Sequence, residues 1–226
     1  MKISKFDKVI WRINGVVILI GCVTALLFAA YGGYHIIKDL TRTRNVHNIV
    51  NVNSETKKEE YLSLGHFSIT EENIFSAPLY SDESISRRSY SKSASSVRNY
   101  YYFNGDTAQD NWLLKNNNSL ISERDEYTDM NPNSTERLTL GFVYTVIESD
   151  SNQDGVMSDS DLYSIYLSDI EGKGLKKITD KVEVIHGSEQ ISKNQYILFV
   201  LKNEKNCALY INLNTGSIEK SVYIDI

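Results

Sequence analysis

The feature that most constrains this chain is an unbroken apolar segment near its N-terminus. From Ile13 to Ile37, 25 consecutive residues carry no formal charge. A helix rises about 1.5 Å per residue, so about 20 apolar residues suffice to cross the hydrocarbon core of a bilayer. Trp11 on one side, and Tyr31 and Tyr34 on the other, have amphipathic rings that favour the two membrane interfaces. We therefore predict a single transmembrane helix over residues 13–37.

Two other interpretations of this segment remain open. Residues 19–22, Leu-Ile-Gly-Cys, resemble a bacterial lipobox, in which the cysteine is lipidated, but the apolar run continues for about fifteen residues past Cys22. A cleaved signal peptide is the second alternative, although its apolar region usually has only about 7–15 residues. We favour an uncleaved anchor. Four Lys or Arg residues precede the span and three follow it closely, which favours residues 1–12 in the cytoplasm.

The chain beyond the apolar segment is acidic. The net charge is −5 overall, and it divides into +4 for residues 1–38 and −9 for residues 39–226. An acidic domain repels phosphate backbones, which argues against a nucleic-acid partner. The chain has two cysteines, Cys22 and Cys207, and the first lies within the apolar segment. We therefore expect no disulfide framework.

The remainder of the sequence has the pattern of a β protein that follows a polar stalk at residues 38–60. Apolar residues alternate from Leu138 to Val146, so they share one face of an extended strand. Further short apolar runs lie at residues 61–69, 97–103, 112–114, 182–185, 196–201, 208–213 and 221–226. We predict a mainly β, extracytoplasmic domain over residues 61–226, built as an antiparallel meander of propeller-blade-like sheets or as a sandwich.

Two passages resemble the end of a TolB-type β-propeller blade. Residues 165–172, Ile-Tyr-Leu-Ser-Asp-Ile-Glu-Gly, contain a D-x-x-G turn and lead into Leu-Lys-Lys-Ile-Thr at residues 175–179. Residues 209–216 carry a second copy of this pattern. The resemblance implies blade-like hairpins. A blade takes about 40–45 residues and a ring needs about four blades, so we expect sheets in residues 61–226 that do not close into a ring.

Residues 150–161 form the pattern with the clearest chemistry. Oxygen-bearing side chains stand at loop positions 1, 3, 5, 9 and 12, and Gly155 stands at position 6. Calcium takes about 6–8 oxygen ligands, and a loop of this length that wraps back on itself supplies them. Gly155 permits the sharp turn that this wrapping requires. The predicted ligands are Asp150, Asn152, Asp154, the carbonyl of Val156, Ser158 (directly or through water) and Asp161.

This loop resembles the calcium loops of EF-hand proteins and especially of dockerins, which commonly end in Asp. The resemblance implies a Ca²⁺ ion at these residues, for which we expect a structural role. Asp at position 12 has a shorter reach than Glu, so we expect a modest affinity, at about 10⁻⁴–10⁻³ M as in extracellular modules. An EF-hand has a helix that enters the loop, whereas the preceding residues alternate like a strand, so no helix-opening switch is expected. The alternative is a solvated acidic hairpin loop, because Asp, Asn, Ser and Gly also dominate turns.

The sequence contains no recognisable catalytic motif. The four histidines are scattered, at His35, His47, His66 and His186. No nucleophile elbow, phosphate-binding glycine loop or paired-cysteine metal site is present. Aromatic residues concentrate at residues 97–103 and at Trp112, and we assign them to the core and to cross-strand pairs rather than to a sugar or peptide platform. We therefore expect a protein that is not an enzyme.

These features together predict a calcium-binding protein of the bacterial inner membrane. Its N-terminus is expected in the cytoplasm, and its C-terminal domain is expected in the periplasm or outside the cell. We expect an interaction or scaffold module of the cell envelope that meets a protein partner, and the envelope assignment follows from the TolB resemblance. The alternative is a membrane-tethered hydrolase that acts on an envelope polymer through acidic residues assembled in space.

Overall fold

The computed structural model describes residues 5–40, 50–51, 61–71, 73–83, 94–130 and 137–225. In these residues the chain is mainly β, with antiparallel sheets and one helix. Contacts divide the chain into two compact units, Met1–Asn45 and Val46–Ile226. The prediction of a mainly β, antiparallel protein is confirmed.

The first unit contains helix α1, Lys5–Leu40, which includes the predicted segment 13–37. The large apolar side chains described between Val16 and Phe28 are all exposed, by 50% to 72%. Among the residues that the structure describes, no helix meets the length and apolarity needed to cross a membrane.

The predicted stalk, residues 38–60, lies mostly outside the described residues. One part of it differs from the prediction, because Val50–Asn51 form strand β1 and pair with strand β9, Val156–Met157. Val50 is only 2% exposed and belongs to a small apolar cluster with Leu120, Ile147 and Met157. An apolar side chain that can be buried against a sheet draws this short segment into the β domain.

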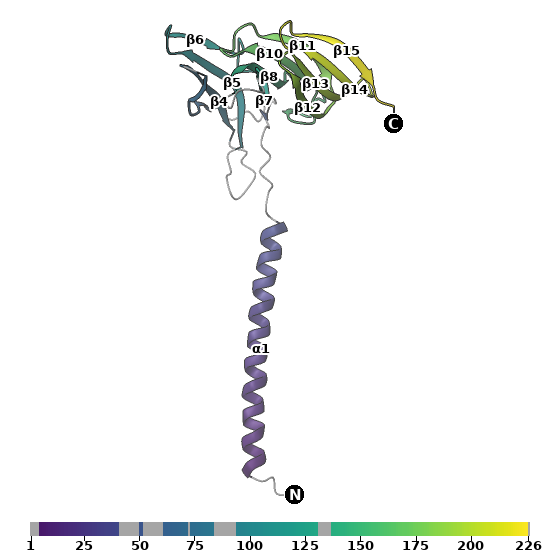
Figure 1. Ribbon diagram of the computed structural model, residues 1–226. Coiled ribbons are helices and arrows are strands. Elements are labelled where there is room, and N and C mark those ends of the chain that lie inside the picture. Colours follow the sequence, from purple (N-terminus) through teal and green to yellow (C-terminus); the bar gives the residue numbers. More distant parts are fainter. Residues whose placement is uncertain are drawn as a thin grey trace. The chain divides into compact units, whose positions relative to one another are not determined.

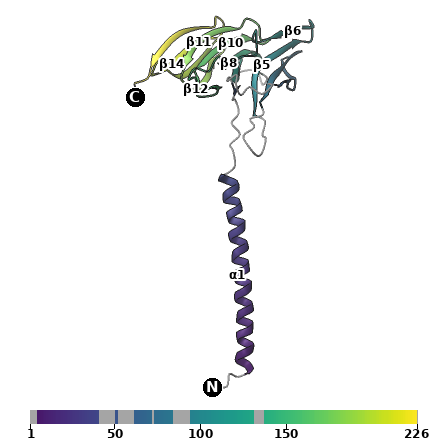
Figure 2. The ribbon, with the colours of Figure 1, turned by 180° about the vertical axis from the view of Figure 1, so that it is seen from behind.

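The β domain contains three larger antiparallel sheets, which follow one another along the chain (Figures 1 and 2). The N-terminal sheet has the order β2-β4-β5-β6, and β3 also pairs with β4. Its strands are β2 (Tyr61–Leu64), β3 (Ser68–Glu71), β4 (Ile74–Glu83), β5 (Ala94–Asn104) and β6 (Gln109–Trp112).

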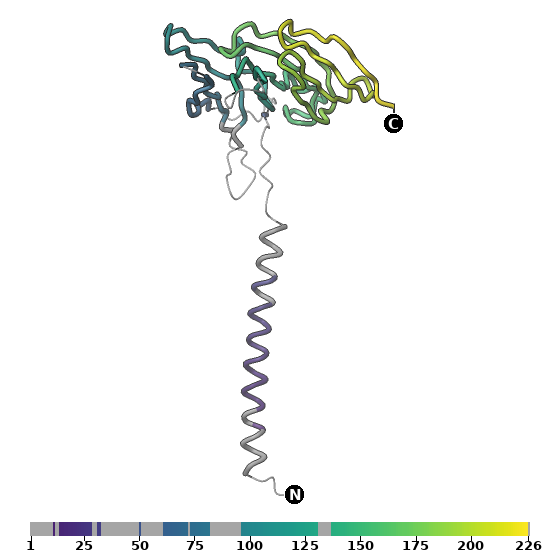
Figure 3. The backbone as a smooth tube through the Cα atoms, in the orientation of Figure 1, coloured from purple at the N-terminus to yellow at the C-terminus, as the bar shows by residue number. Residues whose placement is uncertain are grey.

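The next two sheets are four-stranded antiparallel meanders, in which neighbouring strands are hydrogen-bonded. Figure 3 shows the path of the backbone through this part of the chain. The central sheet consists of β7 (Leu120–Thr128), β8 (Thr139–Ile147), β10 (Tyr163–Asp169) and β11 (Lys176–Val182). The C-terminal sheet consists of β12 (Val184–Ser192), β13 (Gln195–Lys202), β14 (Lys205–Asn212) and β15 (Ser217–Tyr223). The predicted strand at 182–185 is divided, because β11 ends at Val182 and the chain then enters β12 in the next sheet.

Strand β8 connects the two main apolar cores. Phe142 and Tyr144 pack on the side of the N-terminal sheet with Tyr102. Val143, which points to the opposite face, packs with Leu198 and other residues of the C-terminal sheet. The predicted alternation correctly identifies the strand, but it implies only one buried face. Both faces of β8 are buried because a sheet packs on each side.

The two TolB-like passages both fold as antiparallel hairpins, β10–β11 and β14–β15. In the first turn, one carboxylate oxygen of Asp169 accepts hydrogen bonds from the backbone N–H groups of Glu171, at 3.0 Å, and Lys173, at 2.7 Å. In the second turn, the Asn212 side-chain oxygen accepts hydrogen bonds from the backbone N–H groups two and three residues later, those of Asn214 and Thr215. An Asp or Asn therefore organises both turns through its own side chain.

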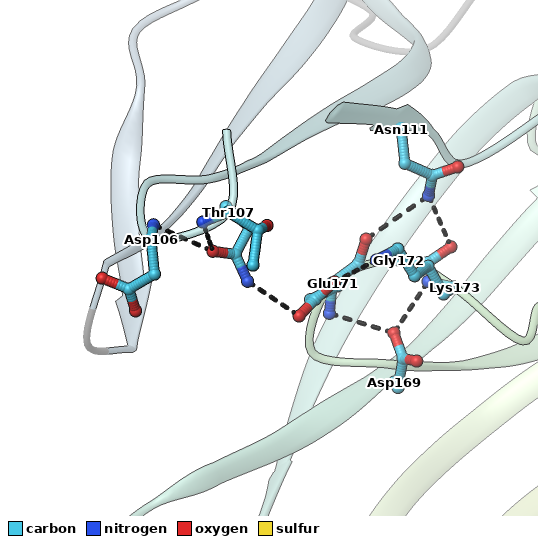
Figure 4. A network of polar contacts seen from close by, with 8 residues as sticks. Asp106, Thr107, Asn111, Asp169, Glu171, Gly172 and Lys173 are labelled. Carbon is cyan, nitrogen blue, oxygen red and sulfur yellow. Dashed lines mark hydrogen bonds and ion pairs between the residues drawn. The ribbon is translucent and has the colours of Figure 1, made fainter. Parts of the chain in front are cut away.

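Figure 4 shows how the β10–β11 turn is joined to the N-terminal sheet. Asn111 donates hydrogen bonds to the carbonyl oxygens of Glu171 and Gly172, at 3.3 Å and 3.1 Å. Asn104 donates to the Glu171 carboxylate at 2.9 Å. Gly172 has a φ of 69°, and a Cβ there would overlap the ring of Tyr102. Glycine is required at this position for both reasons.

Candidate functional site

The predicted calcium loop joins β8 to β10 and includes β9. The side chain of Asp150 accepts hydrogen bonds from the backbone N–H groups of Asp154, at 3.2 Å, and Gly155, at 2.8 Å. Asn152 accepts a second bond from the Asp154 N–H at 2.9 Å, and Asp154 accepts one from the Val156 N–H at 2.9 Å. Each of the first three predicted side-chain ligands therefore turns an oxygen toward the backbone inside the loop.

Gly155 occupies the left-handed region that its position requires, with a φ of 87°. Two residues earlier, Gln153 has a φ of 61° and is not glycine. Two consecutive N–H groups can point at one carboxylate where the backbone turns sharply, and here Asp154 donates to Oδ1 and Gly155 to Oδ2 of Asp150. The backbone turns at Gly155 as expected, and its part in a calcium site stays a prediction.

Asp161 closes the loop. This residue is 1% exposed, and its Oδ1 accepts hydrogen bonds from the N–H and hydroxyl of Ser151, at 2.6 and 2.9 Å, and from the Asn152 N–H at 3.2 Å. Its Oδ2 accepts one bond from the Ser158 N–H at 2.9 Å. Burial on its own would raise the pKa of Asp161, but the bonds from Ser158 and Ser151 outweigh burial and lower this pKa.

In the part of the chain that the structure describes, no group of three or more His, Cys, Asp or Glu side chains is placed to hold a metal ion. The donor set of the loop consists of carboxylate, amide, carbonyl and hydroxyl oxygens, which are the ligands that calcium prefers. Asp150 and Asn152 are held in inward orientations by backbone donors. Among the described residues, Oδ2 of Asp161 accepts one hydrogen bond, from the Ser158 N–H, and a carboxylate oxygen has more than one acceptor position. The residue types of the loop are therefore those that calcium prefers, whereas the described carboxylates are not gathered around one centre.

A second candidate site lies on the N-terminal sheet and was not assigned from the sequence. Strand register places Ile69 opposite Phe75, and Phe75 opposite Phe103, so these side chains share one face. Tyr101 lies two residues before Phe103 and therefore on the same face, opposite Trp112. We call this surface the aromatic face; it comprises Phe67, Ile69, Phe75, Tyr101, Phe103 and Trp112.

Three residues of the aromatic face are exposed, whereas Phe75, Tyr101 and Phe103 are partly buried, and ring contacts hold several of the side chains together. Trp112 and Tyr101 meet edge to face with centroids 5.0 Å apart, and Phe67 meets Tyr101 in the same way at 6.0 Å. Ile69 is 70% exposed, Phe67 50% and Trp112 43%. Large apolar side chains gathered on one surface at this exposure are typical of an interaction site.

The polar edge of this face is formed by one hydrogen bond. The Tyr101 hydroxyl donates to the Asp110 carboxylate at 3.0 Å, and this bond raises the pKa of Tyr101. The neighbouring Tyr102 points to the opposite face and is 1% exposed. The assignment of the aromatic cluster to the core and to cross-strand pairs is therefore correct, because Tyr102 lies in the core and Tyr101 pairs with Trp112 across two strands. It did not identify the exposure of Trp112, which is 43%. The apolar run at 61–69 and this cluster were the signals in the sequence, but only strand pairing brings them together.

Little in the described residues supports catalysis. His186 lies near Asn206, with Nε2 and the amide oxygen 2.8 Å apart, and within the described part no hydrogen bond joins it to a serine or a carboxylate. Cys207 is buried, and burial raises the pKa of its thiol, which disfavours the nucleophilic thiolate. In comparisons with known proteins, no family model and no curated protein matches this chain.

Proposed function

We propose that this chain is a membrane-anchored interaction module of the bacterial cell envelope that binds a protein partner through the aromatic face. The observation that carries the proposal is the exposure of Phe67, Ile69 and Trp112 on one face of a sheet. Tyr, Trp and Phe are enriched at the centres of protein interfaces, and a few such residues supply most of the binding energy. An apolar surface on the partner would bury these side chains.

The proposed membrane anchor is residues 13–37. Its support is the uncharged sequence of this segment and the exposed apolar side chains between Val16 and Phe28 in α1. Each Val, Ile, Leu or Phe favours insertion by roughly 0.3–0.6 kcal/mol, and no formal charge within the segment opposes them. Alkaline extraction of native membranes tests this part. The chain should remain in the pellet, and its release into the supernatant would contradict the anchor.

A calcium ion is proposed as a structural component of the β domain. It would neutralise carboxylates that otherwise repel one another, and so tighten the loop between β8 and β10. The supports are the oxygen donor set and the inward orientation of Asp150 and Asn152. The residues that would hold it are Asp150, Asn152, Asp154, Val156 (through its carbonyl), Ser158 and Asp161.

Titration calorimetry of the full chain in detergent tests the calcium proposal. The wild type should release or absorb heat on addition of calcium, and the double variant Asp150→Ala/Asp154→Ala should not. Asp180→Ala, which removes an exposed carboxylate outside the loop, should bind calcium like the wild type. Absence of heat in the wild type, or binding retained by the double variant, would reject a calcium ion at this loop.

Site-specific photo-crosslinking tests the interaction proposal in native membranes. A photoreactive residue at position 69 or 112 should form an adduct with one polypeptide, identified by mass spectrometry. The same residue at Ser221, an exposed position of β15, should not form that adduct. Ile69→Asp should abolish the adduct formed from position 112, whereas Ile218→Asp, at an exposed isoleucine of β15, should leave it unchanged. An adduct from position 112 that survives Ile69→Asp would refute the proposal.

The alternative of a membrane-tethered hydrolase takes second place. It requires two carboxylates that face a common cleft, at a separation that depends on the mechanism. Glu123 and Glu183 line one groove of the β domain and lie outside the predicted calcium loop. Loss of a measured hydrolytic activity on envelope polymers in both Glu123→Gln and Glu183→Gln would favour the hydrolase over the interaction module.

A further inference from the structure

Two edge strands lie side by side where the central and C-terminal sheets meet. Among the described strands, β7 pairs with β8 alone and β12 pairs with β13 alone. At one end the two edges are bridged by Gln190 of β12, whose amide accepts a bond from the Thr128 N–H at 2.9 Å and donates to the Thr128 carbonyl at 2.7 Å. Ser188 donates to Asp125 at 3.3 Å. Strands β7 and β12 therefore run in the same direction. The hydrogen bonds described between them involve side chains, and no backbone-to-backbone pairing is described between these two strands.

Toward the other end of these strands lies a groove of about 460 Å³, which is within the range of ligand sites. Six consecutive residues, 183–188, line it from the side of β12. Successive side chains of a strand point to opposite faces, so a run of consecutive lining residues means that the groove follows the backbone edge of β12. An unpaired strand edge offers N–H and C=O groups to another extended chain.

Local irregularities favour access to this edge. The β12–β13 register shifts between Ile185 and Gly187, so His186 is the extra residue of a bulge. The β7–β8 register shifts in the same way between Ile121 and Glu123. A Cβ built on Gly187 would meet no atom within 4 Å, so this part of the groove is open. Bulges of this kind interrupt pairing and are frequent at binding sites.

The groove is negatively charged. Glu123, Asp159 and Glu183 line it, and no lysine or arginine is among the described lining residues. Within the described part of the chain, none of these three carboxylates forms an ion pair. The Asp159 carboxylate accepts a bond from the Ser122 hydroxyl at 3.2 Å, and Glu183 accepts one from the Glu204 N–H at 3.2 Å. The open backbone edge of β12 and the groove beside it define the site. The three carboxylates favour a positively charged ligand.

We propose that this groove binds an extended, cationic peptide segment, which adds a strand to the open edge of β12. Main-chain hydrogen bonds to β12 supply affinity, and Lys or Arg side chains of the peptide pair with Glu123, Asp159 and Glu183. This site is separate from the aromatic face and does not depend on the function proposed for that face. The protein then has two binding surfaces of different chemistry.

Fluorescence anisotropy with the full chain in detergent tests the proposal, using a labelled short peptide of alternating Val and Lys. Glu123→Gln and Glu183→Gln should each raise its Kd on the order of tenfold. Glu189→Gln removes the same charge from β12 outside the groove and should change the Kd less than about twofold. Gly187→Trp should fill the groove and abolish binding, and thermal melts establish that each variant is folded.

Two further peptides separate strand addition from simple attraction between charges. The Val-Lys peptide methylated on alternate backbone nitrogens keeps its charge but loses N–H donors, and it should bind much more weakly. A Val-Glu peptide should not bind. Equal binding of the methylated and unmethylated peptides, equal losses in Glu189→Gln and Glu183→Gln, or no binding of the Val-Lys peptide to the wild type would overturn the proposal.

Discussion

Replacement of Asp161 by asparagine should destabilise the β domain by about 2–4 kcal/mol. With its oxygen at the Oδ1 position, the introduced amide would keep the three donors from Ser151 and Asn152, but its nitrogen would face the Ser158 N–H. A hydrogen bond to a charged acceptor contributes about 1.5–3 kcal/mol, and a buried donor left unsatisfied costs about 1–3 kcal/mol. This is a large share of a typical domain stability of about 5–15 kcal/mol.

Urea unfolding of the full chain in detergent, with a chelator and far-ultraviolet circular dichroism, measures this loss. Asp159→Asn is the matched control, because Asp159 is exposed and, within the described part of the chain, its carboxylate accepts one hydrogen bond, from the Ser122 hydroxyl. Its cost should stay below about 0.5 kcal/mol. If Asp161→Asn costs no more than Asp159→Asn, the view of Asp161 as the hydrogen-bonded closure of the loop is refuted.

The pH dependence of unfolding, measured for the wild type and for Asp161→Asn, gives a second test of Asp161. The pKa of Asp161 is lowered in the folded state, so its contribution to stability is present above the ordinary Asp pKa of about 3.9. That contribution is lost as the pH falls through the folded-state pKa. The stability gap between wild type and Asp161→Asn should therefore be complete at pH 7 and narrow below about pH 4. A gap that stays constant or widens on acidification would contradict this assignment.

Three substitutions test the packing of the central sheet by denaturant unfolding. Gly141→Ala should cost about 3 kcal/mol or more, because the new methyl group would overlap a backbone carbonyl of β10; a cost under about 1 kcal/mol would contradict this close approach. Tyr144→Phe should cost about 1–3 kcal/mol, because it removes the buried hydroxyl 2.6 Å from that of Tyr102. Lys177→Met should cost less than about 1 kcal/mol, because its ion pair with Glu148 is partly exposed; a larger loss would show a stronger pair than its solvation allows.

The strands could be predicted because alternating apolar residues and turn-forming residues are patterns of neighbouring positions in the sequence. The run that contains β8 was identified from alternating apolar residues, and both TolB-like turns were placed at hairpins. Alternation does not tell how many sheets pack on a strand, so the burial of Val143 on the second face of β8 was not predicted. The pairing of Val50 with Met157 depends on a contact distant in sequence, which local patterns do not contain.

The candidate sites show a different limit of sequence reasoning. The residue types at 150–161 indicate a loop rich in oxygen ligands for a cation. They do not reveal that Asp161 accepts four hydrogen bonds from other residues of the loop. The aromatic cluster was visible, yet Tyr101 and Tyr102 point to opposite faces, and a shift of one residue in register exchanges them. The central sheet packs against one face of β5, and this packing decides that Tyr102 is buried and that Tyr101 lies on the other face. Sequence alone therefore identified the cluster as core residues and cross-strand pairs, but not which ring takes which position.

The most direct test of the central proposal is the solvent accessibility of Trp112 in the native membrane. Hydroxyl-radical footprinting compares the oxidation rate of Trp112 in native membranes with that in the purified chain, and uses exposed Tyr223 of β15 as an internal reference. If the aromatic face binds a protein partner, Trp112 should be protected in membranes, while Tyr223 reacts equally in both samples. Equal oxidation of Trp112 in the two samples would contradict the proposed interaction module.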